Sequence, residues 1–243
     1  MDGNNKAARP LQKMFMAVPS SYDFLNRLLT IRLDQVWRKK AVRTILDGKP
    51  ERILDLCTGT GDLAIMLRKH ASSETVIEAL DYSLPMLEVA QKKSLSKSPS
   101  EIKFLYGDAA SMPFEDNYFD VVGIAFAFRN LTYKNPDRDR FLEEIQRVLK
   151  PGGRFVAVET SQPTNAVMRF LFRAYMRLIT KPIGGLLSGH RGAYHYLAHS
   201  AINYYQAPEL KQILLAAGFS EVNYQHLLGG VAGLWECRKN RAK

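Results

Sequence analysis

A short apolar run that leads directly into a glycine-rich turn limits the possible folds of this chain more than any other feature. The run covers residues 52–56 and the turn covers residues 57–61. An apolar run without polar alternation is typical of a strand that is buried on both faces, as in a parallel sheet. Parallel neighbours need crossover connections, so the remaining strands should alternate with helices.

This alternation continues over most of the sequence. Further strands are predicted at residues 75–80, 102–106, 119–126, 154–159, 222–228 and 233–238. Helices are predicted at residues 63–70, from Ser83 to a Ser/Lys-rich loop at 94–100, at 141–149 and at 208–217. Residues 150–153 should stop the helix before the fifth strand. The pattern predicts an α/β, Rossmann-like fold: a mostly parallel seven-stranded sheet with helices on both faces.

We expect one domain over residues 1–243, because this length and a content of 46% hydrophobic and 24% charged residues suit a single globular unit. Within it we predict an N-terminal helical cap at 1–50, a core at 51–160, an inserted substrate lid at 161–207, and a C-terminal helix with a strand pair at 208–243. The lid is predicted as a long helix followed by an irregular glycine-rich segment.

The formal net charge of +10 favours an anionic partner, and no Asp or Glu occurs from Thr160 to Pro208. Arg169, Arg173 and Arg177 recur every four residues among apolar residues in this segment. The stripe predicts peripheral contact with an anionic membrane. A packed helix with a solvated basic face, or a homodimer contact, explains the same pattern.

The cellular location follows from composition. Two distant cysteines favour a reducing cytoplasm. The basic stripe adds an expected association with the cytoplasmic face of a membrane. No apolar run approaches the ~18 residues of a membrane span, and residues 1–12 lack a signal-peptide core.

The glycine-rich turn suits an anionic ligand. Gly59 and Gly61 let the backbone approach a ligand, and the following helix N-terminus favours negative charge. With Ala64 the turn also matches a relaxed dinucleotide fingerprint, and it can be merely a tight strand-to-helix turn. Asp81, which ends the second strand, is placed to accept ribose hydroxyls in either nucleotide hypothesis.

Gly107-Asp108-Ala109 after the third strand separates these hypotheses, since a carboxylate there can meet the exocyclic amine of an adenine. The order of motifs resembles the class I S-adenosylmethionine-dependent methyltransferases. Cys57 replaces that family's usual first glycine, and we expect it to be structural.

The flanking motifs resemble the UbiE/MenG/COQ5 quinone C-methyltransferases. They are Tyr22-Asp23-Phe24-Leu25-Asn26, Trp37-Arg38, Phe128-Arg129-Asn130 and Lys150-Pro151-Gly152-Gly153 followed by Glu159. The resemblance implies transfer of a methyl group from S-adenosylmethionine to a ring carbon of a polyprenylated quinol, giving menaquinone or a ubiquinone precursor. Demethylmenaquinol is the substrate that we expect.

The resemblance implies Thr60, Asp81, Asp108 and Ala109 at the cofactor, and the chemistry of the reaction suggests the catalytic candidates. The residues expected at the cofactor are Asp55, Gly59, Thr60, Gly61, Asp81, Tyr82, Asp108, Ala109 and Ala125, where Ala125 replaces a frequent Ser. The catalytic candidates are Arg129, Tyr22, Asn26, His190 and His195. Arg129 is expected to stabilise a phenolate, Tyr22 and Asn26 to orient the ring, and the histidines to offer acid–base groups. No metal ligand set is expected.

Other classes of function remain open at this stage. A nucleic-acid methyltransferase would use the positive charge, but the Asn-Pro-Pro-Tyr type of segment for a flipped base is lacking. A methyltransferase of another small molecule, or a nonenzymatic NAD-type nucleotide-binding module, would keep the glycine turn without the ring-facing residues.

Overall fold

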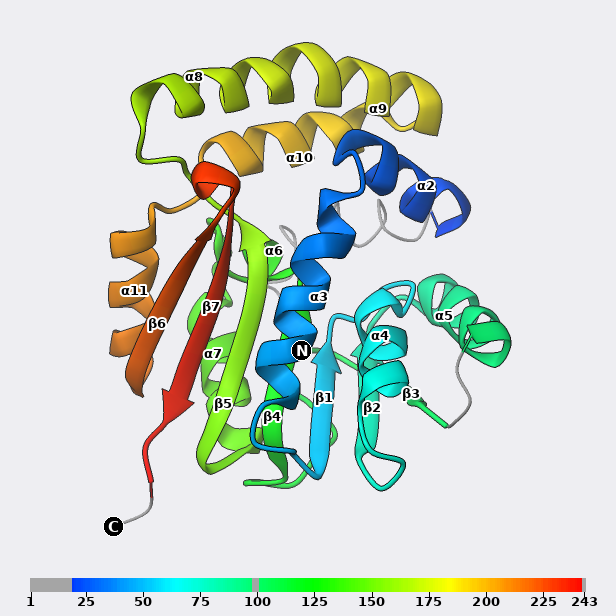
Figure 1. Ribbon diagram of the computed structural model, residues 1–243, viewed down its shortest axis with the longest axis vertical. Helices are drawn as coiled ribbons and strands as arrows, with labels where there is room; N and C mark the ends of the chain where they lie inside the picture. The colour runs from blue at the N-terminus through cyan, green and yellow to red at the C-terminus, as the bar shows by residue number, and fades with distance from the viewer. Residues whose placement is uncertain (1–18, 98–100, 242–243) are drawn as a thin grey trace, which may run out of the picture.

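The computed structural model describes residues 19–97 and 101–241. Its seven-stranded sheet has the order β3-β2-β1-β4-β5-β7-β6, in which β7 is antiparallel to both neighbours and the other pairs are parallel (Figure 1). The strands are β1 Arg52–Leu56, β2 Val76–Asp81, β3 Lys103–Tyr106, β4 Phe119–Ala125, β5 Leu149–Thr160, β6 Phe219–Leu227 and β7 Ala232–Lys239. The predicted mostly parallel sheet of seven strands is confirmed.

Helices cover both faces of the sheet, as its apolar strands require. On one face lie α3 (Leu33–Leu46) and α4 (Asp62–His70), with α5 (Leu84–Lys97) beside α4. On the other face lie α6 (Phe128–Thr132), α7 (Arg138–Val148) and α11 (Ala207–Ala216). Each face has its own core, built around Ile45 and Ile53 on the first and around Phe155 and Trp235 on the second.

The predicted lid is a set of helices that lies across the carboxyl ends of the parallel strands, together with α2 (Pro19–Leu29) (Figure 1). It comprises α8 (Ala166–Tyr175), a π-helical turn (Met176–Thr180), α9 (Lys181–Ser188) and α10 (Arg191–Ile202). The prediction of an irregular segment was wrong at Gly184, which is helical. A Cβ there would come within 2.1 Å of the Tyr194 ring, so the glycine serves the close packing of α9 on α10.

Most element ends differ from the sequence prediction by a few residues, and three further differences concern α5, residues 150–153 and α6. Helix α5 continues to Lys97 instead of ending near Ser94, and residues 98–100 of the predicted loop lie outside the described residues, as do residues 1–18 of the predicted cap. The segment 150–153 belongs to β5, where Gly152 takes a φ of 77° within the strand. Helix α6, which follows β4, was not predicted.

Candidate functional site

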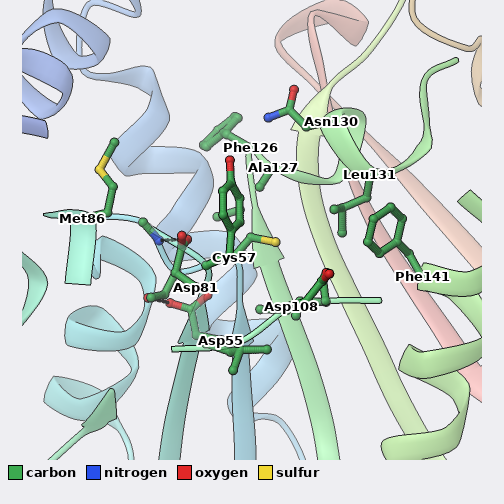
Figure 2. A pocket seen from close by; sticks show the side chains of 18 of the residues that line it. Asp55, Cys57, Asp81, Met86, Asp108, Phe126, Ala127, Asn130, Leu131 and Phe141 are labelled. Atoms are coloured by element: carbon green, nitrogen blue, oxygen red, sulfur yellow. Dashed lines mark hydrogen bonds between the residues drawn. The ribbon is translucent and has the colours of Figure 1, made fainter. Parts of the chain in front are cut away.

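A first cavity opens at the carboxyl ends of β1, β2 and β4, where crossovers leave the sheet in opposite directions. Such a switch point is where open α/β sheets bind ligands. Figure 2 shows Asp55, Asp81 and Asp108 below the cavity, with Met86 on one side and Leu131 and Phe141 on the other. Carboxylates thus face a space that also has apolar walls.

The two glycines of the β1–α4 turn serve different purposes. Gly59 has a φ of 55°, lines the cavity, and has no atom within 4 Å of the place where a Cβ would stand. Gly61 has a φ of 79°, but its Cβ would lie 2.9 Å from the Cβ of Ala90 on α5. Gly59 therefore leaves room for a ligand. Gly61, predicted to contact the cofactor, is not among the lining residues and lets α4 pack against α5.

Asp55, near the end of β1, holds this turn through hydrogen bonds. Its Oδ2 accepts hydrogen bonds from the Thr58 hydroxyl at 2.6 Å and from the Ala64 N–H at 2.9 Å. Burial raises the pKa of the Asp55 carboxyl to about 7, against these two hydrogen bonds. Asp55 lines the cavity, but the bonds that it makes hold the chain where it turns into α4.

Asp81 and Asp108 present carboxylate oxygens at neighbouring strand ends. Asp81 accepts the Ser83 N–H on Oδ1 at 2.9 Å and the Gly59 N–H on Oδ2 at 2.8 Å, and burial raises its pKa. Asp108 accepts the Ala110 N–H on Oδ1 at 2.9 Å. Each carboxylate has further lone pairs, so Asp81 can accept ribose hydroxyls and Asp108 an adenine amine.

The remaining predicted cofactor residues are close to these groups. Tyr82, Ala109 and Ala125 line the same cavity. Thr60 lines it too, while its hydroxyl donates to Asp23 at 2.6 Å and accepts from Lys93 at 3.1 Å. Thr60 thereby links the β1–α4 turn to Asp23 on α2 and to Lys93 on α5.

Cys57, which we expected to be structural, lies in the glycine-rich turn. It has a φ of 55°, and burial together with the Asp81, Asp55 and Asp108 carboxylates raises the pKa of its thiol. A protonated thiol is a poor nucleophile, so the turn gains no reactive group from it.

The residues of this cavity fit S-adenosylmethionine. Carboxylates for the ribose and the adenine amine stand at successive strand ends, the walls beside Leu131 and Phe141 are apolar, and Gly59 carries no side chain where the ligand must approach. These carboxylate acceptors suit an adenosine, because Asp81 can accept its ribose hydroxyls and Asp108, at the next strand end, can accept its exocyclic amine.

A second cavity, of about 490 Å³, lies between α2, α3 and the lid. Its walls are mostly apolar, with contributions from Leu29, Trp37, Met168, Phe172, Met176 and Leu197 among others. Asn26 lines it, as does Arg129, so two of the predicted catalytic residues share this space. Arg38 and Phe126 line both cavities, which therefore meet at this pair.

Arg129 is held from several directions. Its Nη1 donates to Glu159 Oε1 at 3.1 Å, its backbone N–H donates to Glu159 Oε2 at 3.0 Å, and its Nε donates to the Ser200 hydroxyl at 3.1 Å. Glu159 is fully buried and the Arg129 side chain nearly so. The guanidinium is therefore fixed in the cavity wall between β5 and the lid helix α10.

The predicted histidines are not brought to either cavity. His195 is exposed and its ring stacks on His199 with centroids 6.5 Å apart, and His190 is not among the lining residues. The side chain of Tyr22, on α2, lies outside the described residues. Sequence reasoning missed Asp34, Arg38 and Phe126 as cavity residues. The signals for Asp34 and Arg38 were their spacing of four residues on a helix and the Trp37-Arg38 motif, whereas Phe126 was predicted only as the last residue of a strand.

The model of the ubiE/COQ5 methyltransferase family matches nearly the whole chain, over residues 2–239. The chain belongs to this family. Its relatives include proteins named demethylmenaquinone methyltransferase from Thermus thermophilus (44% identical, covering 91% of this chain and 97% of the relative) and Deinococcus radiodurans (39% identical, covering 93% and 90%).

Solved structures support the fold. A SAM-dependent methyltransferase from Aquifex aeolicus matches with a TM-score of 0.56 and 21% identity, over 83% of this chain and 88% of that one. One from Thermotoga maritima matches with a TM-score of 0.61 and 19% identity, over 91% and 96%. The predicted class I fold, the methyltransferase activity and the cofactor S-adenosylmethionine are thus confirmed.

Two further properties of the described residues concern metal ions and membranes. Among them, no group of three or more His, Cys, Asp or Glu side chains is arranged to hold a metal ion. Within the same part of the chain, every helix is too short or too polar to cross a membrane.

Proposed function

We propose that this enzyme methylates a ring carbon of a polyprenylated quinol, converting demethylmenaquinol to menaquinol. The observation that carries the proposal is the large apolar cavity that meets the cofactor cavity at Arg38 and Phe126. Such a space suits an aromatic ring with an isoprenoid chain. The relatives from Thermus thermophilus and Deinococcus radiodurans bear the name demethylmenaquinone methyltransferase, which supports this substrate.

The bound cofactor supplies an electrophilic methyl group on its sulfonium. The residues of the second cavity must make the quinol carbon nucleophilic. When a quinol hydroxyl gives its proton to a cavity carboxylate such as Glu159, the negative charge spreads to the adjacent ring carbon. This carbon forms the bond to the methyl group while the bond between the methyl group and the sulfur breaks. Loss of the carbon's own hydrogen as a proton to solvent then restores the aromatic ring. Arg129 stabilises this charge through its guanidinium, and Glu159 holds the guanidinium in position.

Apolar residues of the lid contribute by excluding water. Met168, Phe172 and Met176 turn toward the cavity from α8 and the π-helical turn, and Asn26 adds an amide that can orient the ring. Reactants held in contact without solvent gain rate through proximity and through stronger electrostatic interactions.

The test compares one variant of each cavity. Arg129→Gln should lower the rate of methyl transfer to a short-chain demethylmenaquinol by about 10²- to 10³-fold at saturating cofactor, because it removes a charged donor at the developing oxyanion. Its affinity for S-adenosylhomocysteine, the demethylated form of the cofactor, is measured by calorimetry and should stay within about twofold of the parent's affinity. Asp81→Asn should show the opposite pattern, with cofactor affinity reduced by roughly 1 to 3 kcal/mol.

Arg43→Gln, an exposed change on α3, is the matched control and should leave both quantities unchanged. Parental turnover of folded Arg129→Gln protein, or equal loss of cofactor affinity in both variants, contradicts the assignment of Arg129. A benzenoid quinol assayed in parallel tests whether a ubiquinone precursor is also a substrate.

The outer face of the lid suits an anionic lipid surface, from which a polyprenyl substrate would enter. Val167, Phe170, Leu171 and Leu178 are exposed large apolar residues at helical spacing, and Leu171 also lines the quinol cavity. Arg173 and Arg177 are exposed along the same helix, and Arg169 is half-buried. The enzyme then binds the cytoplasmic face of a membrane peripherally, with apolar residues in the bilayer and arginines at the headgroups.

Sedimentation with vesicles tests this surface. Binding to vesicles with anionic lipid should fall with added salt, and should fall further in a Phe170→Ser, Leu178→Ser variant. Removing Arg169, Arg173 and Arg177 together should weaken it by about 1 kcal/mol for each arginine near the surface at low salt. Parental sedimentation of both variants, or a stable homodimer that buries Phe170 and Leu178, contradicts the membrane assignment.

A further inference from the structure

Two buried arginine–carboxylate pairs line the quinol cavity. Arg38 and Asp34 pair within α3, with 2.5 Å between Nη1 and Oδ2, and Arg129 and Glu159 join α6 to β5, with 3.1 Å between Nη1 and Oε1. All four residues are at least nine-tenths buried. Among the described lining residues, these four are the acidic and basic ones.

Stability alone does not account for two such pairs beside an apolar space. Taking an ion pair out of water costs several kcal/mol for each ion, and replacement of the pair by apolar side chains is often neutral or stabilising. A cavity that held only an isoprenoid chain would need neither pair. Polar groups of a ligand at two places in the cavity would account for both pairs.

Both pairs have hydrogen-bonding capacity left. The Asp34 carboxylate accepts from Thr30 Oγ1, Gln35 Nε2 and Arg38 Nη1, at 2.7, 2.8 and 2.5 Å. The Glu159 carboxylate accepts from Arg129 Nη1, Arg129 N and Thr160 N, at 3.1, 3.0 and 2.8 Å. A carboxylate has about four acceptor positions and a guanidinium has five N–H groups, so each pair can accept from and donate to the same hydroxyl.

We propose that the two pairs bind the two para hydroxyls of the quinol, one hydroxyl at each pair, so that the enzyme selects the reduced ring. The inference rests on the proposed function and adds Asp34 and Arg38 to the substrate site. Arg129 and Glu159 receive the hydroxyl that ionises, and Asp34 and Arg38 receive the hydroxyl opposite to it.

The proposal explains why each site contains both a donor and an acceptor. A hydroxyl donates its hydrogen to the carboxylate and accepts from the guanidinium. The carbonyl of an oxidised quinone can only accept, and would leave a carboxylate oxygen facing an oxygen lone pair in a dry cavity. Sites that hydrogen-bond a substrate hydroxyl reject analogues without it far more strongly than apolar pockets reject a missing methylene.

Trp37 provides a binding signal, because it lines the quinol cavity while Trp235 lies in the sheet core. Quenching of Trp37 fluorescence is measured in the parent protein with S-adenosylhomocysteine bound, and Trp37→Phe identifies the signal. The ligands are a short-chain prenyl-1,4-naphthohydroquinone kept reduced, the two prenyl-naphthols that each lack one hydroxyl, and the oxidised quinone. We expect all three analogues to bind at least tenfold more weakly than the hydroquinone.

A variant assigns the second hydroxyl. Asp34→Asn should weaken hydroquinone binding about tenfold or more and leave S-adenosylhomocysteine affinity nearly parental. The naphthol that lacks the hydroxyl facing Asp34 should bind Asp34→Asn and the parent with equal affinity. The other naphthol, which keeps that hydroxyl, should bind Asp34→Asn about tenfold or more weakly than it binds the parent. Asp47→Asn, an exposed change at the end of the same helix, is the matched control and should bind all ligands as the parent does.

The outcomes separate this inference from the proposed function. A parent protein that neither binds nor methylates the hydroquinone contradicts the proposed function. A parent that methylates it but binds either naphthol or the quinone equally well overturns the two-hydroxyl inference alone. If Asp34→Asn does not fold, the ligand series on the parent protein still decides.

Discussion

Alanine substitutions at the two glycines of the β1–α4 turn should separate fold stability from cofactor binding. Both glycines have left-handed backbone, which costs about 1–2 kcal/mol for a residue with a Cβ. At Gly61 the new methyl group would also lie 2.9 Å from Ala90 Cβ and 3.3 Å from Phe104 Cε1. Overpacking of this kind adds about 1–3 kcal/mol. Gly61→Ala should therefore cost roughly 2–5 kcal/mol of unfolding free energy.

At Gly59 the same methyl group meets no atom within 4 Å, so only the backbone cost of about 1–2 kcal/mol applies. The methyl group enters the cofactor cavity instead. A chain of this size changes its melting temperature by about 2–4 °C for each kcal/mol. We expect a decrease of roughly 2–8 °C for Gly59→Ala and roughly 4–20 °C for Gly61→Ala, from the same conversion.

Thermal unfolding and calorimetry with S-adenosylhomocysteine give the two readouts. Gly59→Ala should lose at least tenfold in affinity with the smaller loss of stability. Gly61→Ala should lose more stability and, at a temperature where it is folded, bind with an affinity closer to the parent's. The reversed order in either measurement would refute the assignment of Gly59 to the ligand and Gly61 to helix packing.

Three further predictions concern charged groups around the site. The pKa of Asp55 is raised from 3.8 to about 7, mainly by burial. Its contribution to the stability of the fold is therefore complete below pH ~4 and is lost as the pH rises through 7. The melting temperature of Asp55→Asn should depend less on pH than that of the parent between about pH 5 and 8. Asp62 has its pKa lowered to about 2 by Arg38, Lys93 and Arg27, against the effect of burial. Its contribution is therefore present above pH ~4 and lost as the pH falls toward 2, and Asp62→Asn should flatten the acid-unfolding curve in that range. Lys93→Met removes 2.6 Å contacts to both Asp23 and Asp62, and should speed hydrogen exchange in α2 while leaving exchange in β1 unchanged.

The sheet could be predicted from the sequence because each central strand is a short, mostly apolar segment that ends at a polar or glycine-rich turn. Arg52–Leu56 has its predicted limits, since the turn residues stop the strand. The five-residue helix α6 could not be predicted, because it is too short to show a helical period. The segment with Gly184 was predicted as irregular because glycine is a poor helix former, and packing against Tyr194 overrides that preference.

The cofactor half of the site was more predictable than the quinol half. Asp81 ends β2 and Asp108 follows β3, and the ends of parallel strands meet at one edge of the sheet. The quinol cavity instead forms between helices that are distant in the sequence. Asp34 and Arg38 have the spacing of an ordinary surface ion pair on a helix, and contacts from other elements, such as the Phe126 ring against the Arg38 guanidinium, make it a buried one. The histidines were chosen for their acid–base chemistry, and that chemistry does not determine where they fold.

Phe126 shows how the backbone at the end of β4 creates the junction between the cavities. Its φ of 60° is rare for an aromatic residue and costs on the order of 1–3 kcal/mol, so neighbouring contacts must enforce it. Its N–H donates to the Val158 carbonyl at 2.8 Å, its ring lies 6.2 Å from that of Trp37, and the Arg38 guanidinium stands 5.0 Å from the ring centroid. The chain therefore turns sharply out of the sheet there. In the proposed reaction, a methyl group that leaves the cofactor reaches the quinol beside this ring, because Phe126 and Arg38 belong to the walls of both cavities.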